Sequence, residues 1–114
     1  DPASSPGQFP VHYAPQIPCF RYEAHEYGRV VEYLAEHAEW SIILLVLNAR
    51  MLASPKHRVV GMPNHPPSYA RHLYSALREA DTSGTAAMLI EMPSDDPEWF
   101  AIRDRLVRAA MPLL

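Results

Sequence analysis

The stretch that decides the fold is "SIILLVLN", residues 41–48. Six apolar residues, all of them branched, follow one another from Ile42 to Leu47. A half-buried strand would alternate apolar and polar side chains, so a continuous run of this length predicts a strand that is covered on both faces. Such strands are typical of parallel sheets that carry helices on each side.

Three further stretches have the composition of strands. They are "IPCFRY" at 17–22, "HRVVGMP" at 57–63 and "AAMLIEM" at 86–92. Branched, aromatic and other apolar residues dominate them, and prolines stand near the start of the first and at the end of the second. The sequence therefore predicts about four strands.

Three helical patterns alternate with these strands. Residues 27–38 place five apolar side chains on one helical face: Val30, Val31, Leu34, Ala35 and Ala38. A second helix opens at Pro66 and Pro67 and repeats apolar residues at helical spacing until Gly84 stops it. A third follows Asp96 and Pro97, which suit an N-cap and a first turn.

Strands that alternate with helices imply right-handed crossovers and an open sheet. We therefore expect an α/β fold: a small, mostly parallel, Rossmann-like sheet of about four strands with three helices. Five prolines fall within the first eighteen residues, a density that suits neither a helix nor a central strand. The predicted organisation is an extended loop or linker segment at 1–16 and an α/β domain at 17–114.

Composition narrows the function. A formal charge of −3 does not favour a partner that is bound through its phosphates, so we expect no direct contact with nucleic acid. The one cysteine cannot form an internal disulfide, and no apolar run is long enough to span a bilayer. We expect a cytoplasmic protein with no membrane contact.

The carboxyl ends of the predicted strands, where ligands bind in open α/β sheets, are poor in reactive groups. The residues that follow the strands are Asn48, Ala49 and Arg50, then Met62, Pro63 and Asn64, then Met92, Pro93 and Ser94. With four glycines in the whole chain there is no phosphate-cradling loop, which argues against nucleotide binding by the sheet. A response-regulator domain would need an acidic residue where Asn48 stands.

Other reactive side chains have ordinary explanations. The six histidines lack the paired spacing of zinc sites, so we expect surface histidines and no metal site. Asp95 and Asp96 would start a helix, and Cys19 would be a small buried apolar residue. Arg71 and Arg78 would lie on a solvated helix face. The sequence leaves open whether Trp40 and Trp99 are contact residues or part of the core rim.

The N-terminal stretch "SPGQFPVHYAP", residues 5–15, holds the unusual chemistry. Gly7 allows close approach of another surface, and the prolines around it stiffen the chain. In an extended segment His12 and Tyr13 point to opposite sides, so one could reach into a neighbouring cavity. The segment suits a lid or clasp, and the alternative is a solvated linker.

This stretch resembles the interdomain segment of two-domain threonylcarbamoyl-AMP synthases. "YARHLYSALREAD" and "AIRDRLVRAA" resemble helices of the accessory domain that follows it in that family, so the resemblance covers essentially the whole chain. It implies part of an enzyme that converts L-threonine, bicarbonate and ATP into threonylcarbamoyl-AMP and pyrophosphate for tRNA threonylcarbamoyladenosine modification. Catalysis, ATP and Mg belong to the family's amino-terminal domain.

The resemblance implies that this chain has no catalytic residue and no cofactor of its own. Its partner would be the catalytic domain of the same synthase, over whose nucleotide cavity the segment folds. The matching lid positions are Pro6, Gly7, His12, Tyr13 and Pro15, with Tyr13 as the expected direct contact. Members often carry a methionine at position 8, a basic residue at position 11 and a Gly-Leu-Gly-like entry to the last helix, where this chain has Gln8, Val11 and Pro97.

Two other classes of function remain open at this point. One is a free-standing α/β domain that binds protein or RNA through its arginine-bearing helices, for which salt-sensitive binding of tRNA would be the sign. The other is a small-molecule sensor, which needs a pocket that the sequence does not show.

Overall fold

The computed structural model describes residues 15–47 and 57–113, and it confirms the α/β class. The elements in chain order are β1 (Cys19–Tyr22), η2 (Ala24–Glu26), α1 (Tyr27–Glu36), β2 (Ile42–Val46), β3 (His57–Gly61), α2 (Pro66–Thr82), β4 (Ala87–Glu91), η3 (Pro97–Trp99), α3 (Phe100–Ala109) and β5 (Met111–Pro112). The η labels mark single turns of 3-10 helix. Each predicted helix and strand is present within a few residues of its expected bounds.

The sheet has five strands in the order β3-β2-β4-β1-β5, one more than the sequence predicts. Every strand pair is parallel. The additional strand, β5, has only two residues, too few for a recognisable pattern, and Pro112 is tolerated because β5 is at the sheet edge. The main-chain N–H of Leu113 donates to the carbonyl oxygen of Arg21 in β1 at 2.9 Å.

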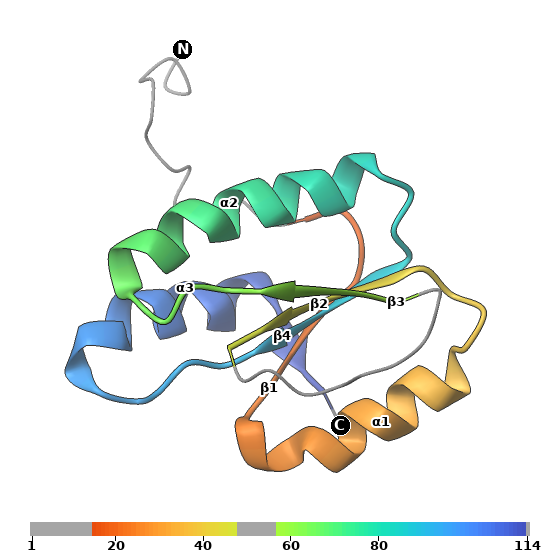
Figure 1. The fold of residues 1–114 in the computed structure, drawn as a ribbon, viewed down its shortest axis with the longest axis horizontal. Coiled ribbons are helices and arrows are strands. Elements are labelled where there is room, and N and C mark those ends of the chain that lie inside the picture. The colour runs from red at the N-terminus through yellow and green to blue at the C-terminus, as the bar shows by residue number, and fades with distance from the viewer. Residues whose placement is uncertain (1–14, 48–56, 114) are drawn as a thin grey trace.

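Helices cover both faces of the sheet, with α2 and α3 on one face and α1 on the other (Figure 1). Because side chains alternate along a strand, β2 and β4 contribute to both layers. Ile43 and Leu45 pack with α2 and α3, whereas Ile42 and Leu44 pack with α1. All five residues of β2 and of β4 are buried, as the continuous apolar run at 42–47 predicts.

Helix α1 is less apolar on its buried side than predicted. Val30 and Leu34 are buried, but Val31 is 46% exposed and Ala35 and Ala38 also lie on the surface. Tyr27 and Tyr33 pack against the core beside them. The aromatic side chains of Tyr27 and Tyr33 thus pack against the core, where the sequence predicts the smaller Val31, Ala35 and Ala38.

The ends of α2 follow the predicted chemistry. Pro66 begins the helix, where the missing N–H costs no intrahelical hydrogen bond. The helix ends at Thr82, and Gly84 follows with φ of 77°, a left-handed conformation that glycine adopts without strain.

The entry to α3 differs in detail from the prediction. Asp96 precedes the single turn η3 rather than α3 itself, and its side chain makes no capping hydrogen bond. Its backbone closes the turn instead, since the Trp99 N–H donates to the Asp96 carbonyl oxygen at 2.9 Å. Trp99 is 3% exposed and belongs to the core, whereas the neighbouring Phe100 is 58% exposed.

Candidate functional site

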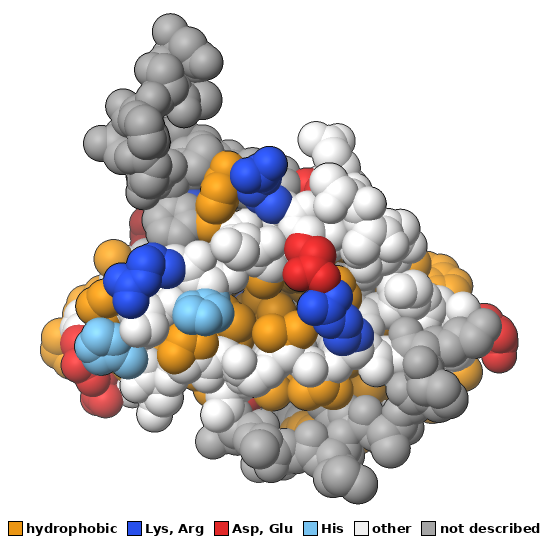
Figure 2. Space-filling model, turned by 45° about the horizontal axis from the view of Figure 1, so that its top comes forward, with side chains coloured by type: hydrophobic (Ala, Val, Ile, Leu, Met, Phe, Trp, Pro, Cys, Tyr) orange, Lys and Arg blue, Asp and Glu red, His pale blue; other side chains and the backbone are white. Residues whose placement is uncertain are grey.

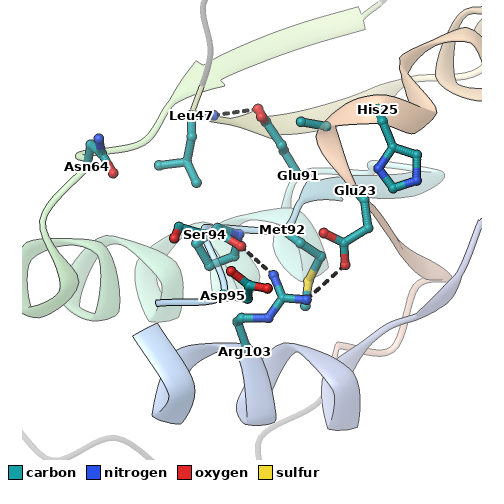
Figure 3. A pocket seen from close by; sticks show the side chains of 11 residues that line it. Glu23, His25, Leu47, Asn64, Glu91, Met92, Ser94, Asp95 and Arg103 are labelled. Atoms are coloured by element: carbon teal, nitrogen blue, oxygen red, sulfur yellow. Dashed lines mark hydrogen bonds and ion pairs between the residues drawn. The ribbon is translucent and has the colours of Figure 1, made fainter. Parts of the chain in front are cut away.

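A pocket of about 790 Å³ opens at the carboxyl ends of the strands (Figure 3). Its walls come from the segments that follow β1, β2, β3 and β4, and from α3. The lining residues are Glu23, Ala24, His25, Leu47, Asn64, Glu91, Met92, Pro93, Ser94, Asp95 and Arg103. The fold therefore forms its pocket at the edge of the sheet where α/β proteins bind ligands.

The pocket also lies at a topological switch point. Strands β1 and β4 are neighbours in the sheet. The chain leaves β1 toward α1 on one face, and it leaves β4 toward α3 on the opposite face (Figure 1). Where two neighbouring strands send their connections to opposite faces, a crevice opens between the loops. Glu23 and the segment 91–95 border that crevice.

The expectation that this edge is poor in reactive groups is wrong. Glu91 is the last residue of β4 and only 4% exposed, and Glu23 follows β1 directly. The sequence analysis placed residue 91 inside a strand and considered only the residues after it. The missed signal was a carboxylate at the end of an otherwise apolar strand. Asn48, where a response-regulator domain would need an acidic residue, lies outside the described residues.

Glu91 joins the carboxyl ends of two central strands. One of its carboxylate oxygens, Oε1, accepts a hydrogen bond from the main-chain N–H of Leu47, just beyond β2, at 2.8 Å. Burial, together with the negative charge of Glu91, raises the pKa of the Tyr69 hydroxyl well above its usual range. Tyr69 is therefore a neutral phenol at physiological pH.

Arg103 holds the two sides of the crevice together. Its guanidinium group donates to the carbonyl oxygen of Pro93, in the segment after β4. It also donates to Oε2 of Glu23, after β1, at 2.9 Å (Figure 3). A single side chain on α3 thus fixes the distance between the segments that leave β1 and β4.

We expect Arg103→Ala to lower the free energy of unfolding by about 1–2 kcal/mol, because a partly buried guanidinium with two acceptors is removed. Chemical denaturation of the 114-residue chain measures this loss. The control is Arg108→Ala, whose exposed ion pair with Asp104 in the same helix contributes about 0.3–0.5 kcal/mol. Equal losses in the two variants would contradict the role of Arg103 as a clamp.

Among the described residues, the lining carries a single hydroxyl group, that of Ser94. Ser94 is exposed, and its Oγ accepts a hydrogen bond from the Asp96 N–H at 3.0 Å instead of contacting a base. Among the residues described, no group of three or more histidine, cysteine, aspartate or glutamate side chains could hold a metal ion. The described glycines, Gly28, Gly61 and Gly84, all lie outside the lining.

Of the five predicted lid residues, only Pro15 is described, and it is half-buried. Pro6, Gly7, His12 and Tyr13 lie outside the described residues. Next to Pro15, the main-chain N–H of Gln16 donates to Oδ1 of Asp81 on α2 at 2.8 Å. The main chain is therefore bonded to α2 at Gln16, shortly before β1 begins.

The arginines of α2 show no shared anion site. The guanidinium of Arg78 lies over the ring of Tyr74, 5.6 Å from its centroid, and Arg71 donates to the Ser68 hydroxyl at 3.2 Å. Figure 2, which views the molecule from the α2 side, shows basic side chains that stand apart, with acidic and histidine side chains among them. No helix in the described ranges is long and apolar enough to cross a membrane.

A scan against family models matches residues 1–111 to the threonylcarbamoyl-AMP synthase C-terminal domain, Sua5_C. The chain belongs to this family. The match confirms the resemblance seen in the sequence. A search of curated proteins found no match.

Solved Sua5 structures have the same fold. The C-terminal Sua5 domain from Pyrococcus horikoshii aligns with a TM-score of 0.64 and 17% identity, over 87% of this chain and 98% of that one. Sua5 from P. abyssi in complex with L-threonine gives a TM-score of 0.68 and 22% identity, over 87% of this chain and 29% of that one. A P. abyssi Sua5 in which an adjacent histidine and tyrosine are changed to alanine aligns with a TM-score of 0.68 and 20% identity. This alignment covers 84% of this chain and 28% of that one.

The aligned chains differ in length from this chain. The chain corresponds to nearly all of the separate P. horikoshii domain, but to less than a third of the P. abyssi Sua5 proteins. A domain of this fold has thus been crystallised alone, and in the P. abyssi Sua5 structures it is part of a longer chain.

Cys19 is buried at 5% exposure, as predicted for a small apolar residue. Burial, reinforced by the negative charge of Asp81, raises the pKa of its thiol from 9.0 to about 12. Since the thiolate is the reactive species, the folded protein keeps this cysteine inert at neutral pH.

We expect Ellman's reagent at pH 8 to leave Cys19 unmodified in the folded chain and to modify it completely in urea. The raised pKa also stabilises the folded state fully below pH 9, and this contribution is lost as the pH rises from 9 toward 12. Denaturation midpoints measured from pH 8 to 11 should fall for the native chain and fall less for Cys19→Ala. Rapid modification of the folded chain would contradict the burial of this thiol.

Proposed function

We propose that the chain is the non-catalytic C-terminal part of a threonylcarbamoyl-AMP synthase. The reaction would join the amino group of L-threonine, bicarbonate and the adenylate part of ATP into threonylcarbamoyl-AMP, with loss of pyrophosphate and water. ATP and Mg would be bound by the catalytic domain of the same protein. The observation that carries the proposal is the family match over residues 1–111, which includes the proline-rich segment as well as the sheet.

The pocket supports the non-catalytic assignment. ATP chemistry requires groups that neutralise phosphate charge, such as a glycine-rich loop, lysines, arginines or a metal. The described lining has three carboxylates, Glu23, Glu91 and Asp95, and its arginine is engaged with Glu23. The described lining thus offers no lysine and no glycine-rich loop for the triphosphate of ATP.

In the proposal, residues 1–16 close over the nucleotide cavity of the catalytic domain. Pro6, Gly7 and Pro15 would stiffen the segment. His12 and Tyr13 would contact the contents of the nucleotide cavity. Closure would exclude water from a labile intermediate. Two observations support this role: the bond from Gln16 to Asp81, which fastens the segment to the domain, and the histidine–tyrosine pair altered in the P. abyssi protein, which has the same residue types in the same order.

The test is to add this chain to the isolated catalytic domain of the same protein and to measure pyrophosphate release that depends on ATP and threonine. We expect the chain to raise the rate and a chain that starts at Ile17 not to do so. An equal effect of both chains would mean that the sheet alone acts on the catalytic domain. No effect of either chain would contradict the proposed partnership.

A further inference from the structure

We propose that the catalytic domain of the same protein docks on an aromatic strip that crosses the α1 face of the molecule from the β5 edge of the sheet. This inference deepens the proposed function and rests on it for the identity of the partner. The aromatic strip consists of four rings and one methionine, which follow one another from β5 to the residues after α1: Met111, Phe20, Tyr33, His37 and Trp40.

Contacts between the rings make the strip continuous. The ring centroids of Phe20 and Tyr33 are 5.7 Å apart, and the ring of His37 stacks on that of Tyr33 with centroids 4.2 Å apart. The centroids of His37 and Trp40 are also 4.2 Å apart. Aromatic pairs at such separations attract each other beyond the area that they bury. The four rings therefore form one feature and not four separate side chains.

The strip reaches the edge of the sheet through β5. Met111 is paired with Phe20 in the strand register. Side chains alternate along a strand, so Met111 is on the same face as Leu113, which is buried in the layer beneath α1. Met111 thus continues the strip on the α1 face.

Both ends of the strip are open to solvent. Met111 is 59% exposed and Trp40 is 42% exposed, while the three rings between them are partly exposed. Aromatic residues and methionine are the types that are enriched at protein interfaces. On the helix surface, the exposed Arg29 and Glu36 lie one turn from Tyr33 and supply a charged border. An apolar centre with a polar rim is the usual composition of a protein interface.

The middle of the strip is held in place by hydrogen bonds. Nδ1 of His37 donates to the carbonyl oxygen of Tyr33, one turn earlier in the chain, at 2.9 Å. The same oxygen accepts the main-chain N–H of His37 at 3.1 Å. A ring that is already fixed loses little conformational entropy when a partner covers it, so more of the contact energy contributes to affinity.

The path of the chain favours the catalytic domain as the partner. The carbonyl oxygen of Pro18, just before β1, accepts the N–H of Met88 at 3.0 Å. The carbonyl oxygen of Ser41, just before β2, accepts the N–H of Ala86 at 2.7 Å. Pro18 and Ser41 thus lie on the two sides of β4 at one edge of the sheet, about 10 Å apart by strand spacing. Trp40 directly precedes Ser41, so the strip ends close to the point where the N-terminal segment joins the sheet.

A domain that is joined at this edge is tethered beside the strip. In the P. abyssi Sua5 structures, a domain of this fold is less than a third of the chain. The family match is to a C-terminal domain, so the proposed catalytic domain precedes it and is joined to it through the N-terminal segment. A tether of this kind raises the effective concentration of the partner, so a surface with two well-exposed anchor residues is sufficient. A second copy of the chain has no such advantage.

The test follows Trp40 by fluorine NMR in the 114-residue chain and in the intact protein from which it comes, both labelled with 5-fluorotryptophan. The measured quantity is the change of each fluorine resonance between H2O and D2O, which is large only for an indole that water reaches. We expect Trp40 to show this solvent-isotope shift in the chain and to lose it in the intact protein. Trp99, which is 3% exposed, should show little shift in either and is the internal reference. The variant Trp40→Phe assigns the resonance in each protein.

Two matched variants of the intact protein locate the contact. Met111→Glu places a charge at one exposed end of the strip, and Phe100→Glu places the same charge on α3, which covers the opposite face of the sheet (Figure 1). We expect Met111→Glu to restore the isotope shift of Trp40, because an unpaired carboxylate is costly to bury. Phe100→Glu should leave Trp40 shielded. Trp99 shows whether each variant is folded, since unfolding exposes both indoles, and the comparison of the unaltered proteins needs neither variant.

Pyrophosphate release by the same intact protein separates this inference from the proposed function. An active protein in which Trp40 keeps its isotope shift would overturn docking on the strip and leave the proposed function standing. An inactive protein would contradict the proposed function and, with it, the identity of the partner. Loss of the shift in the chain alone, together with a dimer in sedimentation, would show that a second copy covers the strip and would also overturn the proposal.

Discussion

Leu89→Ala is expected to lower the free energy of unfolding by about 2–5 kcal/mol. Leu89 has no solvent exposure and is the middle residue of β4, the central strand of the sheet. It stands between Phe20 of β1 and Leu44 of β2 in the strand register. Its side chain fills the layer beneath α1, so truncation would leave a cavity that neighbouring strands on both sides prevent from closing.

Urea denaturation of the 114-residue chain measures this change. The control is Val59→Ala on the edge strand β3, where the side chain is 41% exposed and the expected loss is below about 1 kcal/mol. Similar losses in the two variants would mean that the layer under α1 does not hold the sheet together.

In the proposed two-domain synthase, Tyr13→Ala is expected to lower the rate of pyrophosphate release by about tenfold or more, because an open cavity admits water and positions the reactants less well. The expectation follows from the proposed lid, in which Tyr13 makes the direct contact. Initial rates at saturating ATP and threonine measure it.

The matched control is Phe100→Ala, which truncates another aromatic residue that is 58% exposed on α3. Its rate should stay within about twofold of the unaltered enzyme. A Tyr13→Ala enzyme as active as the Phe100→Ala enzyme would remove the lid role. Thermal unfolding of both variants separates an effect on closure from one on stability.

Most of the fold was predictable because its strongest signals are local. The apolar run at 42–47 fixed a central strand, and Pro66 and Gly84 marked the ends of the longest helix. The strand order β3-β2-β4-β1-β5 was not predictable, since it depends on how the crossovers pack and not on any single segment. The short β5 was missed because two residues carry no periodic pattern.

The position of the pocket could be predicted from the sequence, but most of its lining residues could not. The rule for open α/β sheets pointed to the strand ends, and Met92, Pro93 and Ser94 do line the pocket there. Glu91 was missed because it lies inside the predicted strand 86–92 and only the later residues were considered, whereas β4 ends at Glu91 and keeps that carboxylate buried. Arg103 was missed because the sequence of α3 does not show that this side chain reaches Pro93 and Glu23 in other segments.

The most direct test of the account is ATP- and threonine-dependent pyrophosphate release by the 114-residue chain alone, measured beside the intact protein from which it comes. The account predicts turnover by the intact protein and none by the chain. Turnover by the chain alone would contradict it, and so would an intact protein that lacks the activity.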